Sequence, residues 1–118
     1  MLLIPFCGGR PFVPKDPLQP ERCAEQLKAL SEPLRLRIVT QLRTGAKSVG
    51  QLAELLDVEM VTVSHHLQIL RHAHLVKTQR RGRFVLYRLH EDVFRPSETS
   101  KGCEHLDLGC CRLELPKS

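Results

Sequence analysis

The stretch QLAELLDVEMVTVSHHLQILRHAHLVKTQRRGRFVLYRL, residues 51–89, decides the fold. Its first part carries apolar residues three and four positions apart, which predicts two short amphipathic helices separated by Asp57-Val58-Glu59. Its second part alternates apolar and polar residues on either side of Arg80-Arg81-Gly82-Arg83, which predicts two strands joined by a turn. The order helix, turn, helix, β-hairpin predicts a winged helix-turn-helix.

Working outward, two more helices are predicted before this stretch, over residues 21–30 and 33–43. Pro33 suits the first turn of a helix, and Ser48-Val49-Gly50-Gln51 has the pattern of a capping box. The third helix is therefore expected over 48–56 and the fourth over 60–73. The apolar stripes expected in the core are Cys23, Leu27 and Leu30; Leu34, Ile38 and Leu42; Leu52, Leu55 and Leu56; and Val63, Leu67 and Leu70.

The 118 residues are enough for one mainly α-helical domain with a small β-hairpin. Residues 1–20 hold five of the eight prolines and are expected to form an extended arm. The winged helix domain is predicted over 21–95. Residues 96–118 are predicted to be an irregular tail, in which Leu106, Leu108, Leu113 and Leu115 alternate with polar residues and favour short strand segments.

The positive charge is concentrated in one part of the chain. Between Arg71 and Arg95 there are seven Lys or Arg residues against two acids, which equals the net charge of +5 of the whole chain. Three arginines at one turn repel each other unless an anion meets them, and DNA phosphates are such anions. The residues expected to contact DNA, from the fourth helix and the turn, are Met60, Val61, Thr62, Ser64, His65, Gln68, Arg71, Arg80, Arg81 and Arg83.

No stretch of the sequence has the length and apolar character of a membrane span, and the N-terminus lacks the basic start of a signal peptide. We therefore expect a cytoplasmic protein without a membrane partner. Five cysteines in such a compartment are not expected to form structural disulfides, so thiol chemistry or metal binding is favoured.

Four segments resemble the ArsR/SmtB family of bacterial metal-responsive repressors. They are ALSEPLRLRI (29–38), QLAELL (51–56), TVSHHLQILR (62–71) and LVKTQRRGRFVLYRL (75–89). The resemblance covers about residues 21–94 and implies a homodimer on a double-stranded DNA operator with an inverted repeat. Each fourth helix would enter a major groove about 34 Å from its partner.

Two positions depart from the family pattern. His74 stands where the family usually has glycine, and His is one of the residues that tolerate a positive φ. Pro96 and Gly102 argue against the long C-terminal dimerisation helix that is common in the family. The dimer contact is then expected to involve the first helix, the arm and the tail.

The tail carries the predicted inducer site. The metal site that some members build from cysteines at the start of the third helix is absent, because residues 48–51 contain none. Cys103, Cys110 and Cys111 place three thiols within nine residues, and soft thiolates select thiophilic ions. This tail resembles the arsenic-responsive branch, which implies As(III) or Sb(III) as inducer.

Alternatives remain open at this stage. His105 would complete a Cys₃His set for zinc, cadmium and lead are further candidates, and Cys7 from the arm could add a ligand. The same cysteines would also serve a redox or sulfur-species sensor, or a structural zinc module. An enzyme is not expected, because no nucleophile, base and orienting group can be assembled from these motifs.

Overall fold

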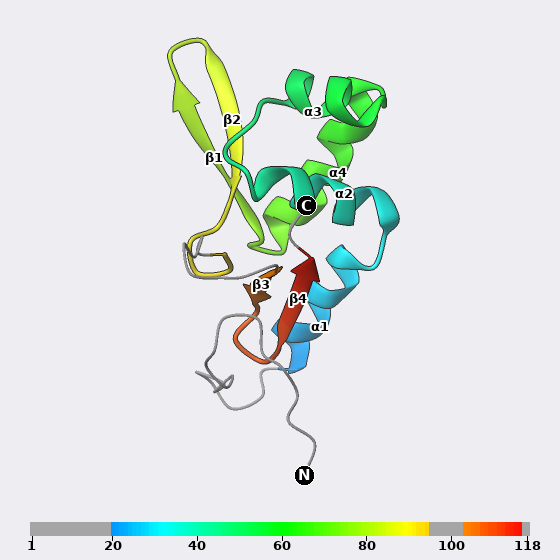
Figure 1. Ribbon diagram of the computed structural model, residues 1–118, viewed down its shortest axis with the longest axis vertical. Coiled ribbons are helices and arrows are strands. Elements are labelled where there is room, and N and C mark those ends of the chain that lie inside the picture. The colour runs from blue at the N-terminus through cyan, green and yellow to red at the C-terminus, as the bar shows by residue number, and fades with distance from the viewer. Residues whose placement is uncertain (1–19, 95–102, 117–118) are drawn as a thin grey trace.

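The computed structural model describes residues 20–94 and 103–116 (Figure 1). Residues 1–19, 95–102 and 117–118 lie outside the described part, which leaves out almost all of the predicted arm and the start of the predicted tail. Four helices come first: α1 (Pro20–Leu30), α2 (Pro33–Leu42), α3 (Val49–Leu56) and α4 (Met60–His72). Two antiparallel hairpins follow, β1 (Val76–Arg81) with β2 (Phe84–Leu89), and β3 (Cys103–Asp107) with β4 (Arg112–Pro116). The winged helix-turn-helix prediction is confirmed.

Local capping explains where two of the helices begin. The Glu32 carboxylate accepts a hydrogen bond from the Arg35 amide at 3.0 Å, with Pro33 opening α2. Ser48 and Gln51 form the predicted capping box, with reciprocal bonds of 3.2 and 2.9 Å at the start of α3. These caps satisfy amide groups that the helices leave unpaired.

One apolar core joins the helices to both hairpins. Its centre lies between α2, α3 and α4, where Ile38, Leu52, Val63, Leu67 and Leu70 have no exposed surface. Tyr87 and Leu89 of β2 and Leu106 and Leu108 at the second hairpin extend the same core. No helix within the described residues is long and apolar enough to cross a membrane.

Two predicted apolar stripes are partly wrong. Leu27 in α1 is 40% exposed and Leu55 in α3 is 55% exposed. In α1 the inward face is instead made by Gln26, Ala29 and Leu30, because the Gln26 amide donates a hydrogen bond to the Ala73 carbonyl at 3.3 Å. The inward face of α1 therefore differs from the one that its apolar spacing predicts, and the bond from Gln26 to Ala73 is part of this contact.

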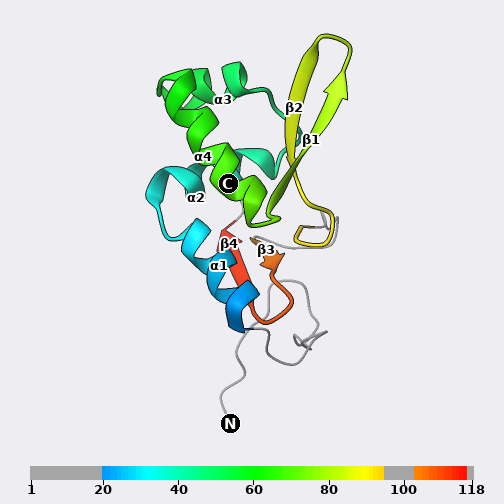
Figure 2. The same ribbon diagram turned by 180° about the vertical axis from the view of Figure 1, so that it is seen from behind.

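The wing, defined as β1, β2 and their turn, is tied to the helices at its base. Lys47 and Tyr87 exchange two backbone hydrogen bonds of 2.9 and 2.7 Å, so the segment before α3 pairs with β2. At the other end Arg81 pairs with Phe84, and Gly82 supplies the positive φ of 58° that the turn requires. Figure 1 and Figure 2 show the tip projecting beyond the helices.

Residues 103–116 form a hairpin, which corrects the prediction of an irregular tail for this part of the chain and agrees with the short strands expected from its leucines. Leu106 and Leu108 are buried, and the Asp107 amide donates to the Val93 carbonyl at 2.7 Å. Leu108 and Cys111 close the turn with a backbone hydrogen bond of 2.9 Å. Figure 1 places this hairpin beside α1.

Candidate DNA-binding surface and thiol cluster

One face of α4 is free of the core. Val61, His65, Gln68, Arg71 and His72 are exposed along it, and Thr62 and Ser64 flank it half-buried. The opposite face is fixed, because Val63, Leu67 and Leu70 are fully buried. The helix thus presents a defined stripe whose members include most of the α4 residues expected to contact DNA. Met60 begins the helix and is 56% exposed.

The wing carries further positive charge. Arg80, Arg81 and Arg83 at its tip are all exposed, as the sequence predicts. Lys77 and Arg88 nearer the base differ from them, because both pair with the carboxylate of Glu91, at 2.7 and 3.1 Å. These cations hold the pKa of Glu91 at about 2, chiefly through the hydrogen bond from Lys77.

Behind the exposed stripe, α4 is bonded to α2 through His66. The Arg35 guanidinium lies 3.1 Å from His66 Nδ1, and because guanidinium groups only donate, this nitrogen accepts. The same Arg35 donates through Nε to the Ala29 carbonyl at 2.5 Å. Burial lowers the pKa of His66, and the neighbouring Arg35 lowers it further, against the opposing effect of Glu32. His66 therefore orients α4, while its neighbour His65 is exposed.

His74 occupies the position after α4 that usually carries glycine. Its φ is 61°, in the left-handed region that non-glycine residues seldom adopt. The His74 amide donates to the Arg71 carbonyl at 3.0 Å, and the Leu75 amide reaches back to the Leu70 carbonyl at 3.0 Å. These bonds end α4 and lead directly into the wing.

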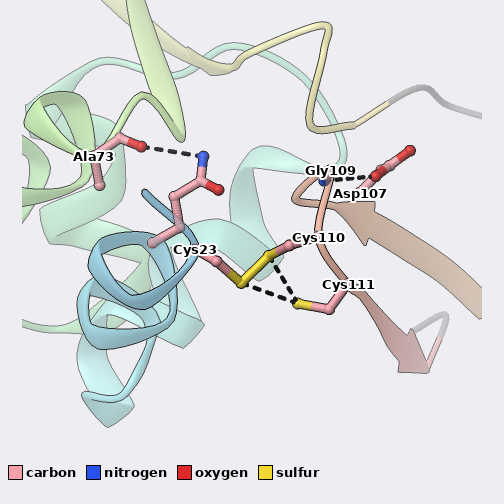
Figure 3. The surroundings of a disulfide bond; sticks show 7 residues. Cys23, Ala73, Asp107, Gly109, Cys110 and Cys111 are labelled. Carbon is pink, nitrogen blue, oxygen red and sulfur yellow. Dashed lines mark hydrogen bonds between the residues drawn. A yellow bond between two sulfur atoms is a disulfide. The ribbon is translucent and has the colours of Figure 1, made fainter. Parts of the chain in front are cut away.

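Three sulfur atoms meet where α1 approaches the second hairpin (Figure 3). Cys23 of α1 is joined by a disulfide to Cys110, with their Cα atoms 6.1 Å apart. The free thiol of Cys111 lies 3.8 Å from the Cys110 sulfur and 4.0 Å from the Cys23 sulfur. We call Cys23, Cys110 and Cys111 the thiol cluster. It is the single group of metal-ligating type found among the described residues.

The disulfide corrects two predictions. The cysteines were not expected to form such bonds, and Cys23 was expected to pack in the core, whereas it is half-buried and bonded to Cys110. Its spacing in α1 resembles that of an apolar residue, so periodicity concealed its role. The one sequence signal for its role is that it is a cysteine, because any further cysteine of the chain could join the adjacent pair Cys110-Cys111.

The remaining candidate ligands are Cys103, His105 and Cys7. The backbone of Cys103 pairs with Pro116, at the end of the hairpin remote from Cys110 and Cys111, and its side chain lies outside what the structure describes. Its predicted part in the inducer site stays a prediction. His105 pairs with Glu114 along the hairpin and is not grouped with the three sulfurs. Cys7 lies outside the described residues.

Burial and charge both act on the free thiol. Desolvation raises the pKa of Cys111, and the nearby Asp107 carboxylate raises it further. Asp107 is itself oriented by a hydrogen bond from the Gly109 amide at 2.9 Å. Both effects favour the protonated form of the Cys111 thiol, so an ion that binds its sulfur has to displace a proton.

Known proteins share this architecture and much of this sequence. The helix-turn-helix domain family model matches residues 30–79. The chain is 40% identical over 103 residues to the transcriptional regulator NmtR of Mycobacterium tuberculosis, covering 86% of each chain. It is 43% identical over 81 residues to the repressor SmtB of the same organism, covering 64% of this chain and 60% of that one.

Solved structures agree with these relatives. A homodimeric winged helix-turn-helix DNA-binding domain from Mycobacterium bovis, a possible ArsR-family regulator, matches with a TM-score of 0.57 and 32% identity. That match covers 58% of this chain and 64% of the other. The repressor BigR of Xylella fastidiosa matches with a TM-score of 0.56 and 38% identity, over 60% and 70% of the two chains. The chain therefore belongs to the ArsR/SmtB family of winged helix-turn-helix transcriptional regulators, which are not enzymes.

Proposed function

We propose that the protein is a homodimeric repressor that binds an inverted-repeat operator and releases it when the thiol cluster takes up a thiophilic ion, As(III) or Sb(III) first. The single observation that carries this proposal is the meeting of three sulfurs between α1 and the second hairpin. Zinc, cadmium and lead are the alternative ions. The cytoplasm is the compartment in which such a repressor would act.

The DNA-binding part rests on the charge and exposure of two elements. The α4 stripe would enter the major groove, and the arginines of the wing would meet the flanking phosphates. In a two-fold symmetric dimer the two α4 helices would contact half-sites about 34 Å apart. The family membership supports both the DNA and the homodimer.

The spacing of the sulfurs supports ion binding once the disulfide is reduced. In a tetrahedral zinc site, bonds of about 2.3 Å to sulfur separate the thiolates by about 3.8 Å, and this gives the scale of sulfur separations around a bound thiophilic ion. The Cys111 sulfur already lies 3.8 and 4.0 Å from the other two. Reduction would let Cys23 and Cys110 separate to a similar distance. Partial burial of all three side chains would limit the access of water to the bound ion.

A route from the cluster to α4 passes through α1. Cys23 precedes Gln26 by one helical turn, and the Gln26 amide holds the carbonyl of Ala73 at the end of α4. A change in the distance between α1 and the second hairpin would therefore act on the C-terminal end of α4. A coupling of roughly 1–3 kcal/mol is enough to change operator affinity about 5- to 150-fold.

The test is a titration of the fully reduced protein on its own upstream DNA, read by fluorescence anisotropy. Arsenite, antimonite, cadmium, lead and zinc are added separately, and release at one equivalent per subunit supports the proposal. Cys23→Ser and Cys111→Ser should bind DNA normally and lose the response. Cys103→Ser is the matched comparison: if it alone loses the response, the site is centred on Cys103, and if no ion releases DNA, the ion proposal fails.

The disulfide favours a second candidate function, a thiol-based redox sensor on the same scaffold. In that case Cys23 and Cys110 give two electrons and two protons to an oxidant such as a low-molecular-weight disulfide, which is reduced to two thiols. Oxidation without any metal would then change DNA affinity in the wild type and leave Cys110→Ser unaffected. Equal affinity of the oxidised and reduced proteins would exclude this function.

A further inference from the structure

Val61 is an anomaly on the α4 stripe. It is 79% exposed, the highest value among the large apolar side chains that the structure describes. It lies nine residues before Leu70, which at 3.6 residues per turn places it on the side of the helix opposite that fully buried side chain. Val61 therefore points away from the core, at the end of the helix that helix-turn-helix proteins place against bases.

The neighbours of Val61 are polar or are held by the protein. The next exposed residues along the stripe, His65 and Gln68, both carry groups that form hydrogen bonds. Met60 is the adjacent apolar residue, and its terminal methyl lies close to Gly50. A Cβ atom added to Gly50 would be 4.0 Å from this methyl, so the Met60 side chain lies over the start of α3. Val61 is then the most exposed apolar group on this stripe.

The chemistry of the major groove identifies what Val61 would contact. Thymine is the base that presents an apolar group there, the C5 methyl, while the other groove edges present hydrogen-bond donors and acceptors. Valine is also branched at Cβ, so its methyl groups occupy a restricted set of positions and form a stiff contact surface. The exposed arginines of the wing supply the charge complementarity that would bring this face to DNA.

We infer that Val61 packs on the C5 methyl of one thymine in each half-site and so selects thymine at that position. This inference rests on the proposed DNA binding and adds a base preference to it. Gln68 lies seven residues further along the same face, about 10 Å at 1.5 Å per residue. That distance corresponds to about three base-pair steps, so Gln68 contacts a different part of the half-site.

The experiment starts from a DNA duplex enriched by the reduced protein from a random library. Each thymine of the enriched half-site is then replaced by deoxyuridine, symmetrically in both halves, which removes the methyl and keeps the base pairing. At one position the wild type should bind about fourfold more weakly per half-site, the effect of losing one buried methyl-sized group. Val61→Ala keeps only the β-methyl, so it should discriminate clearly less than the wild type between the thymine and uridine duplexes at that position.

Gln68→Ala is the matched control from the same stripe. It should bind all duplexes more weakly and keep the preference for thymine, because it retains Val61. Both substituted positions are exposed, so thermal unfolding of the variants should match that of the wild type.

The outcomes separate the two proposals. The role of Val61 is overturned if uridine at no position of the enriched sequence weakens binding. It is also overturned if uridine weakens the binding of Val61→Ala as much as that of the wild type. Both results leave DNA binding intact. Failure to enrich any sequence overturns the sequence-specific DNA binding itself, and the role of Val61 with it.

Discussion

Cys111 shows how a single side chain links the chemistry of the site to pH. Its pKa is raised first by burial and then by the Asp107 carboxylate. Asp107→Asn removes the second cause and keeps an oxygen that can accept the hydrogen bond from the Gly109 amide. We therefore expect a lower pKa of Cys111 and faster alkylation of this thiol near neutral pH.

The measurement is the rate of iodoacetamide labelling of Cys111 as a function of pH, followed by peptide mass spectrometry on the oxidised protein. The variant profile should move to lower pH than that of the wild type. An unchanged profile would mean that burial alone sets the pKa. Glu114→Gln, on the exposed part of β4, is the control and should leave the profile in place.

At the scale of elements, the contact between α2 and α4 depends on the protonation of His66. The His66 pKa lies below its ordinary value of 6.5, because the imidazole is half-buried and accepts from Arg35. The folded state favours neutral His66. The stabilisation of the folded state by neutral His66 is therefore complete above the pKa that His66 has in the unfolded chain, and it is lost as the pH falls through the lower pKa that His66 has in the folded protein. Acidification should loosen the support of the recognition helix.

Urea unfolding from about pH 7.5 downward provides the measurement, since the unfolded chain titrates near pH 6.5. The wild type should lose stability over this fall in pH, and His66→Gln should lose less. A variant with the same pH dependence as the wild type would show that other groups cause the loss. His72→Gln is a suitable control, because His72 is an exposed residue of the same helix.

Elements could be predicted from sequence where their signals are local. The capping box at Ser48 and the Gly82 turn are each contained in a few residues, and the structure reproduces both. The orientation of α1 could not be predicted, because it depends on a bond from Gln26 to Ala73, 47 residues away. Local periodicity favoured Leu27 instead, which the structure leaves 40% exposed.

The candidate site residues also divide into those that local sequence patterns predict and those that depend on contacts between distant segments. The exposed α4 and wing residues follow from short patterns, whereas the thiol cluster joins segments that are 87 residues apart. The pair Cys110-Cys111 is visible in the sequence, but its partner is selected by how the second hairpin packs beside α1. The alternating leucines predict the strands of this hairpin, but its position beside α1 also depends on the bond between Asp107 and Val93, for which the sequence contains no local signal.

At the scale of the whole molecule, the disulfide should change global stability. It constrains the unfolded chain over a separation of 87 residues, and such bonds typically contribute about 2–4 kcal/mol to the free energy of unfolding. Urea unfolding of the wild type should shift to lower urea when a reductant is added. Cys110→Ser should unfold at the lower concentration in both conditions, and an equal midpoint of the oxidised and reduced wild type would contradict the expectation.

The bond between Cys23 and Cys110 also makes the DNA-binding module a covalent ring, since α2, α3, α4 and the wing all lie between these two residues. Cutting the backbone once inside a ring opens it without separating its parts. A protease that cleaves the exposed turn at Arg81 would leave two fragments that migrate as one molecule until a reductant divides them. The oxidised protein can therefore be nicked within its DNA-binding surface and still remain one molecule.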